Sequence, residues 1–374
     1  MTDTYSLEKA KAYQKKREGV RLFELFYTPA LLFCMLAFPI SQALKIWASQ
    51  ITTQPYGLVA VYFIFYSLFM ILMDGPVAFY TGYQLEKQFG LSNHTPASWL
   101  ADFVKRAVLS FMLSAGLIEA LYFLIRRFPD RWWLLAWAGF AGMSYILGKV
   151  FPVFIVPLFY KYGKVENESL KQRIFDLAKR YGLPVENVYS LNLSRTTKKA
   201  NAAFMGMGKT KRVVLSDTLL AHFTADEIEA VVAHELGHFK HKDIWKSLGL
   251  GLMSSFAGFW MVFRVLDPAA RAFGFQGVGD IGALPLVFLI FFGFHLLMMP
   301  LQNGFSRMLE RAADRFALTA FPQKEAFISC MDKLSRVNLA DPDPHPLVEW
   351  LFYDHPAISK RIKAAREWKN YHAA

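Results

Sequence analysis

Residues 231–242 read Val231-Val-Ala-His-Glu-Leu-Gly-His-Phe-Lys-His-Lys242, and the rest of the chain is organised around this stretch. It contains the pattern His-Glu-x-x-His, in which His234 and His238 stand four positions apart. On a helix this spacing places both imidazoles on one face, one turn apart, so both can reach the same ion. Zinc suits such a pair, and Glu235 between them can take a proton from the water that the metal activates.

The residues around this stretch predict where its helix begins and how far it runs. Thr224-Ala-Asp-Glu227 has the pattern of a capping box, and Phe223 and Ile228 are placed as a hydrophobic staple. From that start we expect one helix to run towards Asp243 and on into the apolar run that follows. Because apolar residues flank the His-Glu-x-x-His trio, its polar groups need partners, which argues against a solvated charged face.

Composition indicates a membrane protein. Hydrophobic residues make up 54% of the 374 residues and aromatic residues 16%, yet the net charge is +12. An apolar chain that is also basic is typical of multispanning proteins with positively charged cytoplasmic segments. Nucleic-acid binding is disfavoured, because the basic residues form no soluble domain of their own. The two cysteines, Cys34 and Cys330, exclude a disulfide framework and a cysteine metal site.

Six apolar runs are long enough to cross the roughly 30 Å hydrocarbon layer. They lie at about 22–48, 56–80, 104–126, 131–157, 243–266 and 281–303. An even number of spans puts both termini on one side, and the Lys/Arg bias of the termini and of the middle segment predicts that this side is the cytoplasm. The basic hairpin at 126–131 is the exception. We therefore expect a membrane domain with four spans at 1–160, and a second domain at 161–374 that includes the last two spans.

Several residues inside the predicted spans are costly in lipid. They are Asp74, Glu119, His295, Gln302 and Asn303. Such residues usually face the interior of a helix bundle or a water-filled cavity. Two interpretations remain open: the residues pair with one another and hold the helices together, or they line a hydrated space that opens to the catalytic site.

Between the fourth and fifth runs the sequence predicts a small α/β region. Residues 166–180 have the pattern of an amphipathic helix that ends at Gly182 and Pro184, and residues 188–193 predict a short strand. Residues 201–207 and 211–216 predict two strands of a hairpin. The expected fold is therefore a mainly α integral membrane protein with about six transmembrane helices. It should carry a cytoplasmic zincin-like metalloprotease domain with a small β-hairpin or sheet.

A catalytic zinc usually has three protein ligands and a water, so one further ligand is needed. The candidates are Glu310, Asp314, His345 and His355. Glu310 and Asp314 are one helical turn apart beyond the sixth apolar run, so Glu310 could bind the metal while Asp314 holds an imidazole N–H of a ligand histidine. Alternatively, both belong to a solvated helix face whose arginines balance them. A close third histidine is excluded, because position 244 is Ile244.

Taken together, these motifs resemble the type I CAAX prenyl endopeptidases, integral-membrane zinc proteases that trim prenylated C-terminal motifs. The motifs that carry the resemblance are His-Glu-Leu-Gly-His, Glu310-x-x-x-Asp314, Asn201-Ala-Ala-Phe204 and Asp354-His-Pro-Ala-Ile-Ser-Lys-Arg361. Further matches at 83–90, 157–159 and 212–220 extend the resemblance over most of the chain. The ordered set is far more specific than His-Glu-x-x-His alone, which would identify only a zincin.

The resemblance implies one Zn²⁺ ion per chain, with His234, His238 and Glu310 as its ligands. It implies that Glu235 is the general base and that Asp314 orients a ligand histidine. These assignments agree with the roles that the residues themselves suggest.

The resemblance also implies how substrate is held. The predicted substrate-binding residues are Asn201, Ala202, Ala203 and Phe204. A peptide backbone would add beside this strand, because an exposed edge offers main-chain hydrogen bonds to an extended chain. His355 and Arg361, from the family's His-Pro-x-x-x-x-Arg pattern, would stabilise the oxyanion or bind the peptide terminus. His345-Pro346 also begins such a pattern, but it has Leu351 in place of the arginine, so we prefer His355.

Two features depart from the family pattern. Eukaryotic members have seven spans and this chain has six predicted ones, which indicates a prokaryotic or otherwise shortened member, in the inner membrane if prokaryotic. The family's Asn-Ala-Tyr-Phe is Asn-Ala-Ala-Phe here, which bears on substrate preference more than on chemistry.

The expected function is a membrane-embedded zinc metalloendopeptidase. Its partners would be the lipid bilayer and a peptide or protein substrate, prenylated or membrane-bound, with no nucleic acid. One alternative is an HtpX-like quality-control protease, and another is a non-catalytic zinc-binding membrane scaffold. Four predicted spans before His-Glu-x-x-His and the matched tail favour the CAAX type. The intact Glu235 argues against the scaffold, because a structural zinc site has no use for a base.

Overall fold

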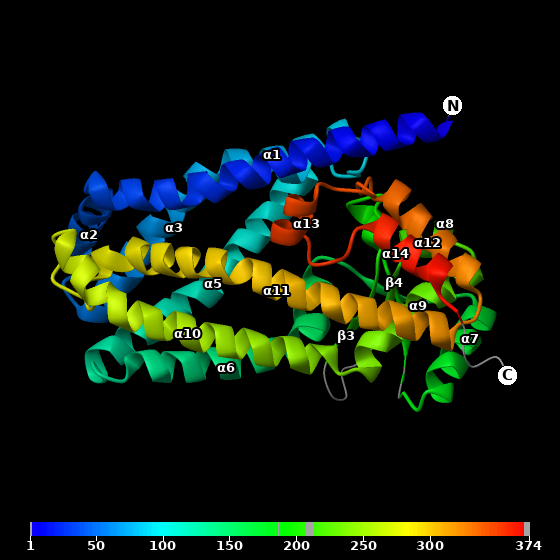
Figure 1. The fold of residues 1–374 in the computed structure, drawn as a ribbon. Coiled ribbons are helices and arrows are strands. Elements are labelled where there is room, and N and C mark those ends of the chain that lie inside the picture. Colours follow the sequence, from blue (N-terminus) through cyan, green and yellow to red (C-terminus); the bar gives the residue numbers. More distant parts are fainter. Residues whose placement is uncertain (1, 184, 186, 207–211, 370–374) are drawn as a thin grey trace.

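The computed structural model describes residues 2–183, 185, 187–206 and 212–369. Long helices run side by side along most of the molecule, and a small sheet with several shorter helices lies at one end (Figure 1). The start of α1 and the last helix, α14, both lie near that end. The molecule therefore has a helical part and a smaller mixed α/β part.

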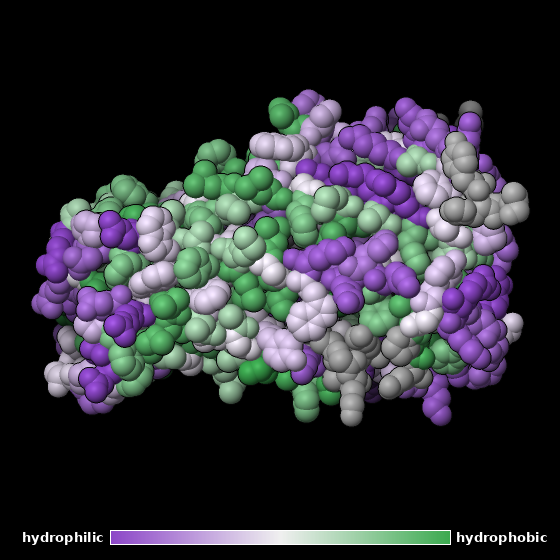
Figure 2. Space-filling model, turned by 60° about the horizontal axis from the view of Figure 1, so that its bottom comes forward, coloured by the Kyte–Doolittle hydropathy of each residue, from purple (hydrophilic) through white to green (hydrophobic). Residues whose placement is uncertain are grey.

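Six helical segments of the described chain are long and apolar enough to cross a membrane, as the sequence predicts. The helices that form them are α1 (Thr2–Ala37), α3 (Pro55–Phe79), α5 (Pro96–Arg127), α6 (Trp132–Val150), α10 (Asp243–Ala272) and α11 (Leu284–Ala320). Short segments extend some of them: η1 (Tyr80–Gln84) and α4 (Leu85–Gln88) follow α3, η2 (Phe151–Ile155) and η3 (Val156–Leu158) follow α6, and η6 (Ile281–Ala283) precedes α11. Figure 2 shows a broad hydrophobic surface over the helical part, between hydrophilic surfaces at the two ends.

The first span differs from the prediction. A single span at about 22–48 is wrong, because α1 ends at Ala37 and a separate helix, α2 (Ile40–Ile51), follows it. Pro39 lies in the break, and proline both lacks the N–H that a helix needs and clashes with the preceding turn. The candidate span lies instead in α1, within Leu7–Ala37, and α2 is not part of it.

The α/β end contains a four-stranded sheet in the order β1-β2-β4-β3. Its strands are β1 (Tyr162–Lys164), β2 (Val188–Leu191), β3 (Ala202–Met205) and β4 (Arg212–Ser216). β2 and β4 are parallel, whereas β3 pairs with β4 in antiparallel register, which confirms the predicted hairpin. The predicted turn at 208–210 lies outside the described residues. β3 is an edge strand, so one of its sides pairs with β4 and the other side has no neighbouring strand among the described residues.

Several short helices lie at this end of the molecule (Figure 1), and most of them share one hydrophobic cluster with the sheet. They are α7 (Glu168–Arg180), α8 (Asp217–His222), α9 (Ala225–Lys240), α12 (Lys324–Val337), α13 (Pro346–Phe352) and α14 (Ile358–Glu367), with the 3-10 turn η4 (Leu193–Arg195). The helix predicted at 166–180 is therefore present as α7, and Asn167 caps it. The last turns of α11 enter the same cluster through Ala317 and Leu318, so the sixth span extends into the α/β end.

The helix that carries His-Glu-x-x-His begins where the sequence predicts and ends earlier than expected. Thr224 caps α9, and the reciprocal capping box with Glu227 is present. α9 ends at Lys240, and Lys242 has a left-handed backbone, with φ 57°, before α10 begins at Asp243. The predicted continuation of one helix into the fifth span is therefore wrong: the chain turns sharply between the two helices.

Two of the five costly polar residues of the spans support the first interpretation, and two others line a cavity. The Gln302 amide donates to Ser254 Oγ at 3.1 Å, and Asn303 donates to the Leu351 carbonyl, so both hold helices together. Asp74 and His295 instead line a cavity of about 520 Å³ together with Arg21 and Glu24. None of the predicted catalytic residues is among the described residues that line that cavity.

Candidate active site

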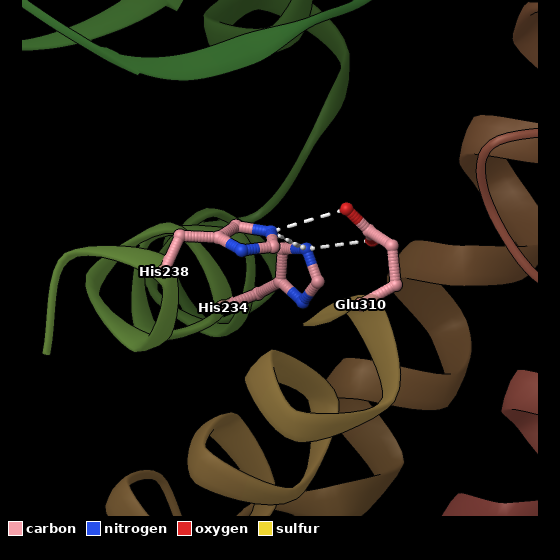
Figure 3. Close-up of side chains that lie close together, drawn as sticks. All are labelled: His234, His238 and Glu310. Atoms are coloured by element: carbon pink, nitrogen blue, oxygen red, sulfur yellow. Dashed lines mark hydrogen bonds and ion pairs between the residues drawn. The ribbon is translucent and has the colours of Figure 1, made fainter. Parts of the chain in front are cut away.

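Three predicted ligands converge from two helices. His234 and His238 extend from α9, and Glu310 faces them from α11 (Figure 3). The two Nε2 atoms lie 3.2 Å apart. The Glu310 carboxylate places Oε2 3.2 Å from His234 Nε2 and Oε1 3.2 Å from His238 Nε2. Of the four candidates for a third ligand, Glu310 is the one that forms a close group with both histidines.

The hydrogen bonds behind the two histidines leave both Nε2 atoms free to bind a metal. His234 Nδ1 lies 2.9 Å from Asp314 Oδ1, and His238 Nδ1 lies 3.0 Å from Asp243 Oδ2. A carboxylate at Nδ1 favours the tautomer with the proton on that nitrogen. The lone pairs of His234 Nε2 and His238 Nε2 and the carboxylate of Glu310 then point at one place. Without a cation between them these groups repel one another. This donor set fits a bound metal.

The pKa values of both histidines also show that a positive charge is favoured at this place. Burial lowers the pKa of His234, but its hydrogen bonds with Asp314 and Glu310 outweigh burial and raise the pKa to about 9. Burial also lowers the pKa of His238, and the Glu310 carboxylate again reverses the direction and raises it. A cation between the donors, whether a proton or a metal ion, is therefore favoured.

Asp243 is a residue that the sequence interpretation missed. Its side chain is buried, it contacts His238 through one oxygen, and its other oxygen lies 2.8 Å from Lys246 Nζ. It can reach back to His238 only because the left-handed Lys242 reverses the chain between α9 and α10. Helical spacing would not have found it, since residues five apart on a continuous helix do not face each other.

Asp243→Ala is expected to lower metal affinity about 10- to 100-fold, the usual cost of losing the partner of a ligand histidine. Competition with a chelator on the purified chain measures this affinity. Lys246→Gln is the matched control, because it removes the ion pair at Asp243 but leaves the contact with His238. Equal affinities in the two variants would contradict a role for Asp243.

A glycine within His-Glu-x-x-His lets the two helices that carry the predicted metal ligands approach each other. A Cβ added at Gly237 would lie 3.0 Å from Ala313 Cα and 3.1 Å from the Ala313 carbonyl oxygen. Both contacts are with the backbone of α11, which cannot rotate away as a flexible side chain could. The close crossing at Gly237 and Ala313 is what brings Glu310 within reach of the histidines of α9.

Gly237→Ala is expected to push α9 and α11 apart, to destabilise the protein by about 1–3 kcal/mol, and to weaken metal binding. Thermal unfolding and metal content measure the two effects. Gly249→Ala on α10 is the control, because a Cβ there meets nothing within 4 Å. Wild-type melting and metal content in Gly237→Ala would show that the close crossing is not required.

We call His234, His238 and Glu310 the metal group. Glu235 connects this group to the edge strand β3. Its Oε2 accepts a hydrogen bond of 3.1 Å from the backbone N–H of Phe204 in β3. The Asn201 carbonyl accepts a hydrogen bond from Ser216 N at the end of β4, and the Phe204 N–H points to Glu235 instead. Because backbone groups alternate along an antiparallel strand, those of Ala202 and Phe204 point away from β4. The predicted substrate strand therefore has a free edge beside the predicted base.

A cavity of about 370 Å³ joins this edge to the metal group. Its lining includes Asn201, Ala202, His234, Glu235, His355 and Arg361. A second missed residue, Asn338, holds the strand in place: its amide accepts from Ala200 N at 2.9 Å and donates to the Ala200 carbonyl at 3.1 Å. No motif in the sequence indicates this contact, because it joins the end of α12 to a loop far away in the chain.

The two tail residues contact different residues around the predicted metal ligands. His355 is half exposed, with its Nε2 3.3 Å from Glu310 Oε1 and its Nδ1 bound to Asp354. Arg361 is buried and binds Asp314 through two hydrogen bonds of 2.6 and 2.9 Å. Its guanidinium also lies 3.4 Å from His234 Nδ1. Arg361 is therefore placed to hold Asp314, the partner of the predicted ligand His234, and contact with an oxyanion stays a prediction for both tail residues.

His345, the alternative start of the His-Pro pattern, lies elsewhere. It caps α13, where its Nδ1 accepts from the backbone N–H of Leu347 at 3.3 Å. Its pattern partner position, Leu351, also lies in α13. The preference for His355 over His345 agrees with these positions.

Comparison with known proteins places both parts of the chain in one family. Residues 164–369 match the model of peptidase family M48, and residues 1–161 match a model described as CAAX prenyl protease N-terminal, five membrane helices. In this part the structure has four candidate spans and, in addition, the 12-residue helix α2.

Individual relatives agree with the family models. An uncharacterised metalloprotease, YhfN of Bacillus subtilis, is 32% identical over 91% of this chain and 80% of its own length. CAAX prenyl protease 1 of Saccharomyces cerevisiae is 29% identical over 78% of this chain and 68% of its own length. The crystal structure of S. mikatae Ste24p has the same fold, with a TM-score of 0.87 at 23% identity, over 97% of this chain and 89% of that one.

Proposed function

Because the chain belongs to peptidase family M48 and is a membrane metalloendopeptidase, we propose that it uses zinc to cleave membrane-associated peptides as type I CAAX prenyl proteases do. The metal site would consist of His234, His238 and Glu310, with one ion per chain. Zinc is preferred because two imidazoles and one carboxylate are a common catalytic zinc set that leaves a position open for water.

One observation carries the proposal: the metal group and the free edge of β3 meet at Glu235. An extended peptide that pairs with the backbone of Ala202 would pass directly in front of the carboxylate. Such an arrangement serves peptide hydrolysis, whereas a structural metal site needs neither a base nor a strand edge.

The chain's own residues divide the remaining tasks. When bound, the metal supplies a Lewis acid that polarises the scissile carbonyl and lowers the pKa of a coordinated water. Glu235 takes the proton from the attacking water and returns it to the leaving amine. The N–H of Phe204 holds the Glu235 carboxylate toward the substrate edge. Asn201 to Phe204 align the peptide.

Behind the metal group, Asp314 keeps His234 in the tautomer that presents Nε2, and Arg361 fixes Asp314 in turn. His355 stands nearer the open side of the site. Burial lowers the pKa of His355, but Asp354 and Glu310 outweigh burial and raise it. A protonated His355 would offset charge on the oxyanion or on a peptide terminus.

The substrate and its side of the membrane complete the proposal. The relatives named CAAX prenyl proteases and the matched N-terminal family model support a prenylated or otherwise membrane-bound peptide or protein. The positive charge of the α/β end and of both termini supports an active site on the cytoplasmic side. We also propose a division of the chain near residue 160, with four spans before it and two after it.

The decisive experiment compares two synthetic peptides that differ only in a prenyl group on the cysteine of a C-terminal CAAX motif. The purified chain should cleave the prenylated peptide faster, a chelator should stop cleavage, and added zinc should restore it. Equal rates for the two peptides would refute the substrate class but leave the zinc protease intact. Cleavage that survives the chelator would refute the metal chemistry itself.

A further inference from the structure

A second cavity, of about 390 Å³, lies behind the active site. Arg361 lines both this cavity and the catalytic one, so the Asp314–Arg361 pair separates them. The described lining of the second cavity contains none of the predicted metal ligands and none of the residues of the substrate strand, Asn201 to Phe204. Nothing in the proposed protease mechanism accounts for it.

The lining of this second cavity is strongly basic. Five cationic side chains face two carboxylates, Asp314 and Glu349. Three of the cations have partners: Arg361 binds Asp314, Lys360 pairs with Glu349, and Arg307 donates to backbone carbonyls of α13 and the loop after it. The other two, Arg311 and Arg315, are exposed, and no carboxylate of the described chain pairs with them.

Arg311 and Arg315 also continue an exposed apolar stripe of α11. Leu297, Leu301 and Met308 lie on this stripe, at spacings of four and seven residues that keep side chains on one helix face. Leu297 is 71% exposed and Met308 is 48% exposed. Arg311 follows Met308 after about 4.5 Å of helix rise. A surface that suits lipid chains therefore ends in two unpaired arginines.

The neighbouring helix α13 supports the same position at the membrane surface. It carries Leu347 and Trp350, both exposed and one turn apart, and Trp350 also lines the cavity. Tryptophan is enriched at the headgroup level of bilayers, where its ring meets both apolar chains and water. The cavity thus combines cations, an aromatic ring and an adjoining apolar face.

We propose that this second cavity binds the phosphate of an anionic phospholipid headgroup, with Arg311 and Arg315 as the phosphate ligands. Two guanidinium groups one helical turn apart suit a phosphate, because each can donate two parallel hydrogen bonds to its oxygens. The apolar stripe of α11 would accommodate the start of the acyl chains. The occupant is a lipid rather than a soluble phosphate because the cations lie at the end of that stripe.

The test measures lipid binding by the full chain in uncharged detergent, by native mass spectrometry and by the melting temperature, without any cleavage assay. The probes are phosphatidylglycerol, phosphatidylcholine and inorganic phosphate. Wild-type protein should retain phosphatidylglycerol in preference to phosphatidylcholine. The double variant Arg311→Gln/Arg315→Gln should bind phosphatidylglycerol about tenfold to thirtyfold more weakly, since each basic residue at a membrane surface contributes a factor of about five.

The matched control is Lys363→Gln/Arg366→Gln on α14, which removes the same charge from exposed positions outside the cavity lining. Equal loss of phosphatidylglycerol in both double variants would overturn the site and leave only non-specific attraction. Protection by inorganic phosphate equal to that by phosphatidylglycerol would overturn the lipid assignment. Should the double variant not fold, the single change Arg315→Gln carries the same comparison.

Discussion

Replacing Glu235 with glutamine is expected to abolish peptide cleavage while the metal stays bound. The amide keeps the size of the carboxylate, and its oxygen can still accept the hydrogen bond from Phe204 N–H. It cannot take a proton from the attacking water, and loss of a general base typically costs about 10²- to 10⁴-fold in rate. His234, His238 and Glu310 are unchanged, so metal affinity should remain close to that of the wild type.

Metal content and cleavage are measured on the same preparation of Glu235→Gln. Glu325→Gln is the control, because Glu325 is an exposed residue of α12 and undergoes the same chemical change away from the site. The assignment of Glu235 as base fails if the pure, metal-loaded variant turns over at a rate near that of the control. Loss of both metal and cleavage would instead give Glu235 a structural role.

Replacing Glu310 with alanine is expected to abolish cleavage for a different reason, the loss of the metal. The change removes the one carboxylate among the described residues that lies close to both Nε2 atoms of the histidine pair. With three protein ligands reduced to two, we expect metal affinity to fall about a hundredfold or more. Unlike Glu235→Gln, this variant should be purified with little metal.

Zinc rescue separates loss of a ligand from loss of the fold. Wild-type protein stripped by a chelator should recover activity when zinc is returned. Glu310→Ala should keep the helical content of the stripped wild type yet fail to recover at the same zinc concentration. Full recovery at that concentration would show that Glu310 is dispensable as a ligand.

Hydropathy and local spacing were sufficient for much of the fold. The length and hydropathy of the apolar runs predicted the number of spans, six, although the first run is divided between α1 and α2. Thr224 marked the start of α9, because a capping box is a local pattern and depends little on the rest of the chain. Pro39 is a local signal that a helix ends, so the break could also have been predicted. The apolar residues on both sides of Pro39 instead suggested one continuous span.

The parts of the site that depend on distant contacts could not be read from the sequence in the same way. The residues alone left Glu310, Asp314, His345 and His355 as candidate ligands, and the resemblance favoured Glu310. The structure supplies the physical reason, which is the backbone contact of Gly237 with Ala313 that positions α11 against α9. Asp243 needed the left-handed Lys242, a feature with no reliable sequence pattern for a non-glycine residue.

The free edge of β3 affects which polypeptide segments the enzyme can accept as substrates. A strand edge recognises backbone amides and carbonyls, which every sequence possesses, and it accepts them only in an extended conformation. A segment whose backbone is already hydrogen-bonded within a helix or a sheet has no free amides and carbonyls to pair with this edge. We therefore expect cleavage to depend on how loosely a segment is folded more than on its residues, so that the enzyme would spare intact domains and act on frayed chain ends.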